Sequence, residues 1–178
     1  MRLWSCAVLF VALNLPVLAA DARRDFRSFH LIGSAEIVGS RLRLTPAVMN
    51  QAGAAWFPER KYIAAGFDLT FRFQITDRGG LGEGADGIAF VIQDAGPDAL
   101  AGSGSAGGFA LGGGERNRRK KGIPHSVAVF FDTFLNEDGN DPSDNYVAIS
   151  TNGSVKKMRW PPARLGATRN LPVFLKDG

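Results

Sequence analysis

The sequence predicts an all-β fold, an antiparallel β-sandwich, on three observations. Short segments carry apolar residues at every second position, clusters of Gly, Pro and Asn separate these segments, and no segment sustains an apolar period of 3.6 residues. A period of two is typical of strands with one buried face, and frequent turn residues favour a sandwich over a helical fold.

The clearest expected strand is 67–75, where Phe67, Leu69, Phe71, Phe73 and Ile75 alternate with polar residues. This pattern indicates one solvated face. In 127–134 both alternating sets are apolar, so that strand is expected to be buried on both sides. The glycine-rich segments 77–84 and 101–108 are expected to be loops. Further strands are expected at 41–45, 88–92, 146–150 and 171–175.

The first twenty residues have the pattern of a secretory signal peptide. Met-Arg precedes an apolar run from Leu3 to Leu18, and two alanines follow it. We therefore predict a signal peptide at 1–20 and one domain at 21–178. An uncleaved membrane anchor is the alternative. The expected location is secreted, either extracellular or periplasmic, with no stable membrane span after cleavage. Cys6 is the only cysteine, so the mature domain is expected to contain no disulfide.

The formal net charge is +4, and much of it lies in the run E-R-N-R-R-K-K at 115–121. The plain interpretation of this run is a solvated loop tip. A patch for acidic glycans or lipid headgroups is the alternative. The run contains no interleaved aromatic residues, so nucleic acid is not an expected partner.

An oxygen-rich loop follows the strand that ends at Asp132. A carboxylate at the end of an apolar strand is costly unless a cation compensates it, and calcium takes six to eight oxygen ligands. Asp, Asn and Gly also form turns for local reasons. The residues alone therefore leave a calcium loop and an ordinary turn open. The oxygen donors after Asp132 are Asn136, Glu137, Asp138, Asn140, Asp141 and Asp144.

Several segments, in order, resemble the legume-type (L-type) lectins. V-A-V-F-F-D-T-F-L-N at 127–136, followed by D-P and N-Y-V-A-I, is similar to that family's metal-binding segment. A-D-G-I-A-F-V-I-Q at 85–93 is similar to its sugar-binding segment, and G-G-F-A-L-G at 107–112 to its glycine loop. Residues 42–56 and 66–75 are similar to its early strands. The resemblance runs from about Phe29 to the end. It implies a concanavalin-A-like jelly-roll sandwich that is incomplete at the C-terminus, because the family continues with further strands.

The resemblance implies one calcium ion, held by Asp132, the carbonyl of Phe134, Asn136 and Asp141. The spacing to Asp141 is one residue longer than in plant members, so Asp138 is an alternative ligand. Plant members also bind a transition metal, through positions that match Phe130 and Tyr146 here. Neither side chain suits such an ion, so no transition metal is expected.

For sugar binding, the resemblance implies Asp86, Gly108, Phe134 and Asn136. It also implies a cis peptide bond between Ala85 and Asp86. Gly107 and Gly108 are hard to separate, because the glycine loop is one residue longer than usual. Without the resemblance, Asp86 would be interpreted as a turn residue and Phe134 as part of the core.

These features favour a secreted, calcium-dependent, non-catalytic carbohydrate-binding module with glycans or glycoconjugates as partners. One alternative is an adhesion or assembly module that has kept the fold and lost sugar binding. A glycoside hydrolase is less favoured, because no strand presents two carboxylates on one face. The sequence leaves the sugar and the formation of a homo-oligomer open.

Overall fold

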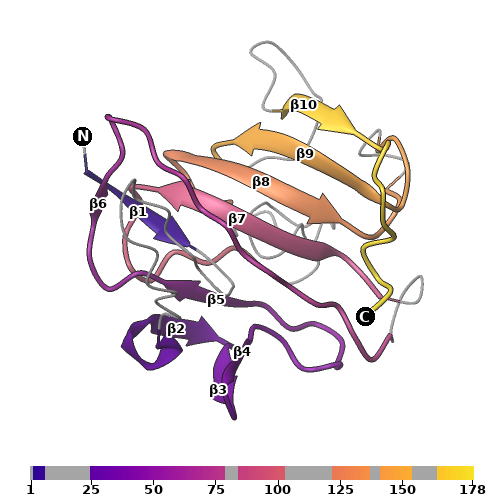
Figure 1. Cartoon of the computed structure of the whole chain (residues 1–178), viewed down its shortest axis with the longest axis horizontal. Helices are drawn as coiled ribbons and strands as arrows, with labels where there is room; N and C mark the ends of the chain where they lie inside the picture. Colours follow the sequence, from indigo (N-terminus) through magenta and orange to yellow (C-terminus); the bar gives the residue numbers. More distant parts are fainter. Residues whose placement is uncertain (1, 7–24, 79–83, 103–121, 137–140, 154–163) are drawn as a thin grey trace.

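The computed structural model describes residues 2–6, 25–78, 84–102, 122–136, 141–153 and 164–178. Within them the fold is all-β, as predicted, with antiparallel strands and a single 3-10 turn (Figure 1). No helix in this part of the chain has the length and apolar character needed to span a bilayer. The basic run at 115–121 lies outside the described residues, as does most of the predicted signal peptide.

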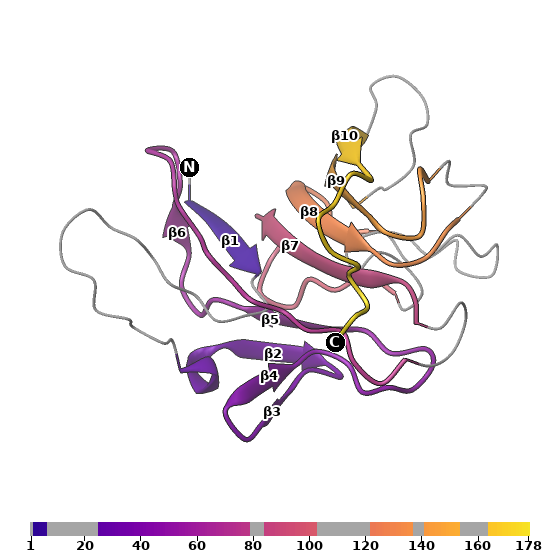
Figure 2. The same cartoon turned by 45° about the vertical axis from the view of Figure 1, so that its right-hand side comes forward.

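Most strands belong to one eight-stranded main sheet, in the order β10-β9-β8-β7-β1-β5-β2, with β6 paired beside β1. A two-stranded hairpin, β3–β4, lies beneath it in Figure 2. The elements are β1 Arg2–Cys6, η1 Phe26–Ser28, β2 His30–Gly33, β3 Glu36–Val38, β4 Arg41–Arg43, β5 Gly53–Trp56, β6 Lys61–Tyr62, β7 Gly87–Gln93, β8 Ser126–Asp132, β9 Tyr146–Thr151 and β10 Arg164–Thr168.

Strand β1 comes from the predicted signal peptide. In the full chain it pairs with β7 on one side and with β5 on the other. The signal peptide itself stays a prediction, and cleavage after residue 20 would remove β1 from the sheet.

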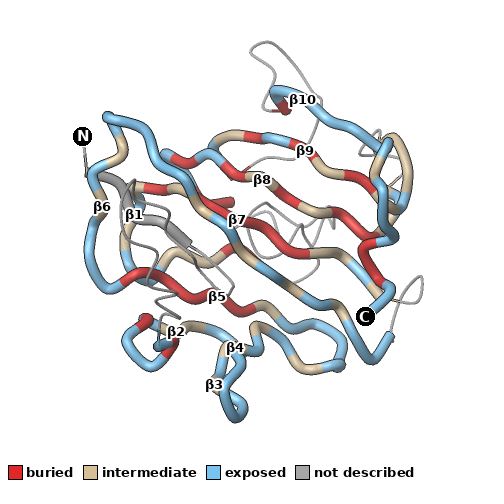
Figure 3. Tube along the Cα trace, in the orientation of Figure 1, coloured by how far each residue is buried: buried red, intermediate tan, exposed pale blue. Residues whose placement is uncertain are grey.

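The centre of the main sheet is the pairing of β7, β8 and β9. Every residue of β7 is in register with a residue of β8, from Gly87 opposite Asp132 to Gln93 opposite Ser126. Along β8 the burial alternates: Ala128 and Phe130 are fully buried, whereas Val127 is 42% exposed. The prediction that both faces of this strand are buried is therefore wrong for the face that carries Val127, which is only partly covered. Figure 3 shows the buried residues running along these central strands and the exposed ones at the edges.

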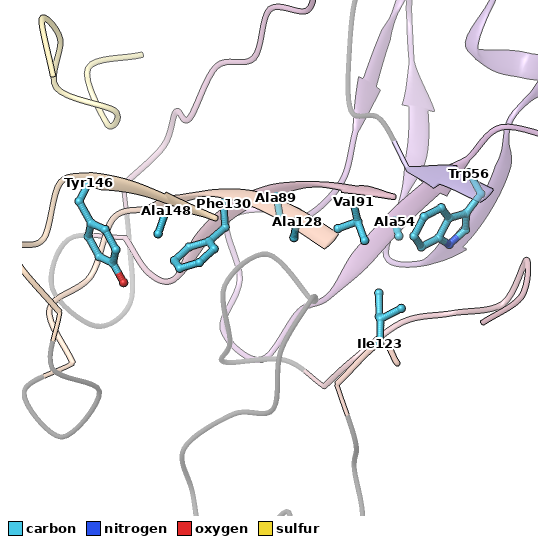
Figure 4. Packing of buried hydrophobic residues seen from close by; sticks show 9 residues of the cluster. All are labelled: Ala54, Trp56, Ala89, Val91, Ile123, Ala128, Phe130, Tyr146 and Ala148. Carbon is cyan, nitrogen blue, oxygen red and sulfur yellow. The ribbon is translucent and has the colours of Figure 1, made fainter. Parts of the chain in front are cut away.

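One face of the sheet carries the larger apolar cluster (Figure 4). The rings of Phe130 and Tyr146 meet edge to face at 5.7 Å between centroids. Trp56 is fully buried, and its indole N–H donates to the carbonyl of Ala99 at 3.0 Å, which satisfies the polar atom of the ring. The cluster consists of Ala54, Trp56, Ala89, Val91, Ile123, Ala128, Phe130, Tyr146 and Ala148.

The opposite face is covered by the hairpin, the N-terminal 3-10 turn and the segment 67–75. This segment crosses the sheet in an extended form (Figure 1). Phe71 and Phe73 contact Phe131 at ring-centroid distances of 5.8 and 4.8 Å, and the intervening polar residues are exposed. The predicted alternation of faces is confirmed for residues 69–75, whereas Phe67, at the start of the segment, is 54% exposed. The prediction of a paired strand is wrong, because only Thr70 forms an isolated bridge.

The expected strand at 171–175 is also absent. Pro172 has no N–H to give to a ladder, and the segment forms bends and a turn. It is fastened by the Leu175 N–H, which donates to the side-chain oxygen of Asn145 at 2.8 Å. The edge of the sheet is instead β10, at 164–168, which the sequence did not predict.

We predict that Phe130→Ala lowers the free energy of unfolding by about 3–5 kcal/mol, because it leaves a cavity in the buried cluster. Val127→Ala, on the exposed face of the same strand, should cost less than about 1 kcal/mol. Denaturant unfolding of both variants in one buffer measures the difference. Equal losses would contradict the assignment of the buried face.

We predict that Gly87→Ala destabilises the fold by at least about 2 kcal/mol. Gly87 has φ +129°, and an added Cβ would lie 2.1 Å from the carbonyl oxygen of Phe131 on the paired strand. Gly166→Ala is the control, because no atom lies within 4 Å of the Cβ position there. A Gly87 variant as stable as the Gly166 variant in thermal melts would argue against the close approach of β7 and β8.

Candidate functional site

The candidate site lies at one end of the central strands. Gly87, Asp132 and Tyr146 are partners across β7, β8 and β9, so they form one row. Because the strands are antiparallel, β7 begins, β8 ends and β9 begins at this same edge. The row therefore brings Asp86, which precedes β7, next to the oxygen-rich loop that connects β8 to β9.

Asp132 is a buried carboxylate, with only 4% of the residue exposed. Its Oδ1 accepts the N–H of Phe134 at 2.9 Å, and its Oδ2 lies 3.2 Å from the hydroxyl of Tyr146. Burial, with a smaller contribution from the nearby charges of Asp141 and Asp86, raises the pKa of Asp132 to about 7, against the opposing effect of the hydrogen bonds from Phe134 and Tyr146. A carboxylate in this position gains from a nearby cation, which would favour its ionised form.

Tyr146 links Asp132 to Asp141. Its hydroxyl lies 2.7 Å from Asp141 Oδ1 as well as 3.2 Å from Asp132 Oδ2. A phenol has one proton, so it can donate to only one of the two carboxylates at a time. Burial and these two carboxylates hold the pKa of Tyr146 well above its ordinary value, so the hydroxyl keeps its proton.

Asp141 closes the neck of the loop. Its Oδ2 accepts the backbone N–H of Asn136 at 3.0 Å, and its own N–H donates to the Asn136 carbonyl at 3.4 Å. Residues 137–140, which include the alternative ligand Asp138, lie outside the described residues. The structure thus brings Asp132, Asn136 and Asp141 together through Tyr146 and the loop neck, and their role as metal ligands stays a prediction.

Arg164 completes the polar cluster from β10. Its Nη2 lies 2.8 Å from Asp141 Oδ1, and the two side chains are only 5% and 4% exposed. The guanidinium also lies 5.6 Å from the centre of the Tyr146 ring, within the range of a cation–π interaction. Sequence analysis missed Arg164. It is paired with Ser150, at the opposite end of β9 from Tyr146, so no local motif connects it to the site.

Asp86 provides the other half of the candidate site. The Ala85–Asp86 peptide bond is cis, as expected from the resemblance. The Asp86 carbonyl accepts the N–H of Thr133 at 3.2 Å, and burial raises the pKa of the carboxyl group. Within the described part of the chain, that carboxyl group has no hydrogen-bond partner. Phe134 is half-buried, and Gly108 lies outside the described residues.

The donor chemistry at the loop fits a hard cation such as calcium. Two carboxylates, an amide side chain and the Phe134 carbonyl are all oxygen donors. No group of three or more His, Cys, Asp or Glu side chains able to hold a metal is present among the residues that the structure describes. The candidate set does not form such a group, because only two of its members are carboxylates. The positions expected to exclude a transition metal are Phe130, which is fully buried against the Tyr146 ring, and Tyr146 itself.

Comparison with known proteins identifies the family of this chain. A galactose-binding lectin of Arachis hypogaea is 39% identical over 98 residues, which is 54% of this chain and 33% of the relative. A mannose/glucose-specific lectin of Centrolobium tomentosum is 36% identical over 162 residues, which is 88% of this chain and 64% of the relative. The chain thus matches less than two thirds of the length of either relative. The family model described as the legume lectin domain matches residues 22–171, and this chain therefore belongs to the legume lectin domain family.

Proposed function

We propose that this chain is a secreted, non-catalytic carbohydrate-binding module whose binding loop depends on one calcium ion. One observation carries the proposal. The buried Asp132, the loop neck at Asn136 and Asp141, and the carboxylate of Asp86 come together at one edge of the sheet. Family membership supports the carbohydrate-binding part of the proposal.

The ion would be held by Asp132, Asn136, Asp141 and the Phe134 carbonyl, and it would supply positive charge to the two buried carboxylates. The chain's own groups would bind the sugar. The Asp86 carboxylate can accept two hydroxyl groups, and the Asn136 side-chain NH₂ can donate to a third. The Phe134 ring offers an apolar surface for the C–H face of a sugar ring. Gly108 would add a backbone N–H.

The partner class that we propose is a glycan or glycoconjugate. The two relatives named above bind different hexoses according to their names, galactose in one and mannose or glucose in the other. The proposal therefore stops short of one sugar. Secretion rests on the predicted signal peptide, and the absence of a transition metal rests on the side chains of Phe130 and Tyr146.

An adhesion or assembly module without sugar binding is the second candidate. It is favoured by the buried contact between Arg164 and Asp141, which already occupies one oxygen of a candidate calcium ligand. Catalysis on a glycosidic bond is disfavoured. Asp132 has the raised pKa that a general acid needs, but it is buried and hydrogen-bonded, so a sugar oxygen cannot reach it.

We expect calcium at a hundred times its dissociation constant to raise the melting temperature by roughly 5–10 °C, because an ion that binds only the folded state stabilises it by mass action. Asp132→Asn should remove most of this shift. Asp144→Asn, an exposed residue of the same loop, should keep it. Thermal melts in calcium and in EGTA measure both. A wild-type melting temperature that is the same in calcium and in EGTA would exclude the calcium site.

We expect Asp86→Asn to weaken glycan binding by about tenfold or more, since an amide replaces a charged acceptor of hydroxyl groups. The calcium-induced shift in melting temperature should stay unchanged. Asp68→Asn is the matched control, because Asp68 is exposed and does not belong to the candidate site. A glycan array in calcium and in EGTA identifies the ligand, and calorimetry then compares the variants.

Calcium binding without glycan binding would favour the adhesion module. Release of free sugar from the bound glycan would contradict the non-catalytic assignment.

A further inference from the structure

The ion pair between Arg164 and Asp141 differs in burial from the other ion pairs of the described residues. Its side chains are 5% and 4% exposed, whereas every other pair has at least 38% of each side chain exposed. Exposed pairs contribute little to stability, but removing one partner of a buried pair leaves a charge without compensation. Arg164 therefore affects the energetics of the cluster far more than a surface arginine would.

The cluster holds an excess of negative charge. Asp132 and Asp141 both contact the Tyr146 hydroxyl, at 3.2 and 2.7 Å, and Asp86 precedes Gly87, which is opposite Asp132 in the sheet. The Arg164 guanidinium adds one positive charge, directly on Asp141. With all three carboxylates ionised, one further divalent cation would neutralise this group of charges.

The two oxygens of Asp141 have different partners. Oδ1 faces the Arg164 guanidinium and the Tyr146 hydroxyl, and Oδ2 faces the loop neck at Asn136. The Arg164 side chain reaches Asp141 from β10, and its guanidinium lies near the Tyr146 ring. The positive charge of Arg164 thus lies beside the Asp141 oxygen that faces Tyr146.

We propose that Arg164 is a resident counter-cation of the candidate binding site: it compensates Asp141 on the Tyr146 side and leaves the Asn136 side for a single divalent ion. Arg164 and the ion then neutralise the same set of carboxylates from two sides. The part of this inference that concerns calcium rests on the proposed function. The compensation of buried charge by Arg164 does not.

The test in the absence of calcium compares melting temperatures in EGTA. Arg164→Gln should lower the melting temperature by about 10 °C, because it leaves the buried Asp141 without its counter-charge. Arg169→Gln is the matched control. Arg169 is exposed, follows the same strand and donates to the carbonyl of Pro142, and its loss should cost no more than about 2 °C. Arg164→Lys keeps the positive charge, so it should lower the melting temperature by less than half as much as Arg164→Gln does.

A second variant separates charge from packing. At pH 8 in EGTA, Asp132→Asn added to Arg164→Gln should restore about half of the melting temperature that Arg164→Gln loses, because it removes one of the two carboxylates that contact the Tyr146 hydroxyl. An arginine that stabilised the fold only by packing would give no recovery. Failure of the double variant to recover, or an equal loss in Arg164→Lys and Arg164→Gln, would overturn the proposal.

With calcium, Arg164→Gln should show a calcium-induced shift in melting temperature about twice that of the wild type. In the variant the ion is the only cation left to compensate the Asp141 charge. A variant that folds only in calcium is the extreme form of this result. A shift equal to or smaller than that of the wild type would contradict the shared compensation. If the wild type shows no calcium shift while the Asp132→Asn recovery is present, the proposed calcium function fails and the role of Arg164 stands.

Discussion

The register of β7, β8 and β9 is the constraint on which the candidate site depends. It places Gly87, Asp132 and Tyr146 in one row, so that the residue before β7 and the loop after β8 meet at one edge. A slip of one residue would turn Asp132 to the other face of the sheet and bring Phe131 to the site. Gly87 helps to fix this register, because the Phe131 carbonyl oxygen lies 2.1 Å from where a Cβ would be, too close for any other residue.

The same register places a polar cluster at the end of an apolar core. Phe130 and Tyr146 belong to the core, yet the Tyr146 hydroxyl contacts two carboxylates. The only cysteine of the chain is Cys6, so no disulfide can fasten the loop between β8 and β9. The loop neck is held instead by backbone N–H groups that donate to Asp132 and Asp141, and by the contact with Arg164. Because these contacts involve the carboxylates of Asp132 and Asp141, the geometry of the loop depends on the balance of buried charge.

Local patterns predicted the central strands well and the covering layer less well. The expected strands at 88–92, 127–134 and 146–150 are confirmed as β7, β8 and β9, and that at 41–45 as β4. The segment 67–75 shows why a period of two is not sufficient: it specifies which side chains face the core, but not whether a neighbouring strand supplies hydrogen bonds. The prediction at 171–175 failed because Pro172 interrupts an otherwise apolar run.

The sequence by itself determined the all-β class, the alternating faces of the central strands and the run of oxygen donors after Asp132. These are local properties, fixed by side chains a few residues apart. Only the tertiary structure decided which groups surround Asp132 and Asp141. Arg164 reaches Asp141 along the sheet from β10, and Asp86 arrives from the start of β7. Contacts of this kind depend on strand order and register, which arise from pairing between distant segments and leave no pattern in the sequence around any one residue.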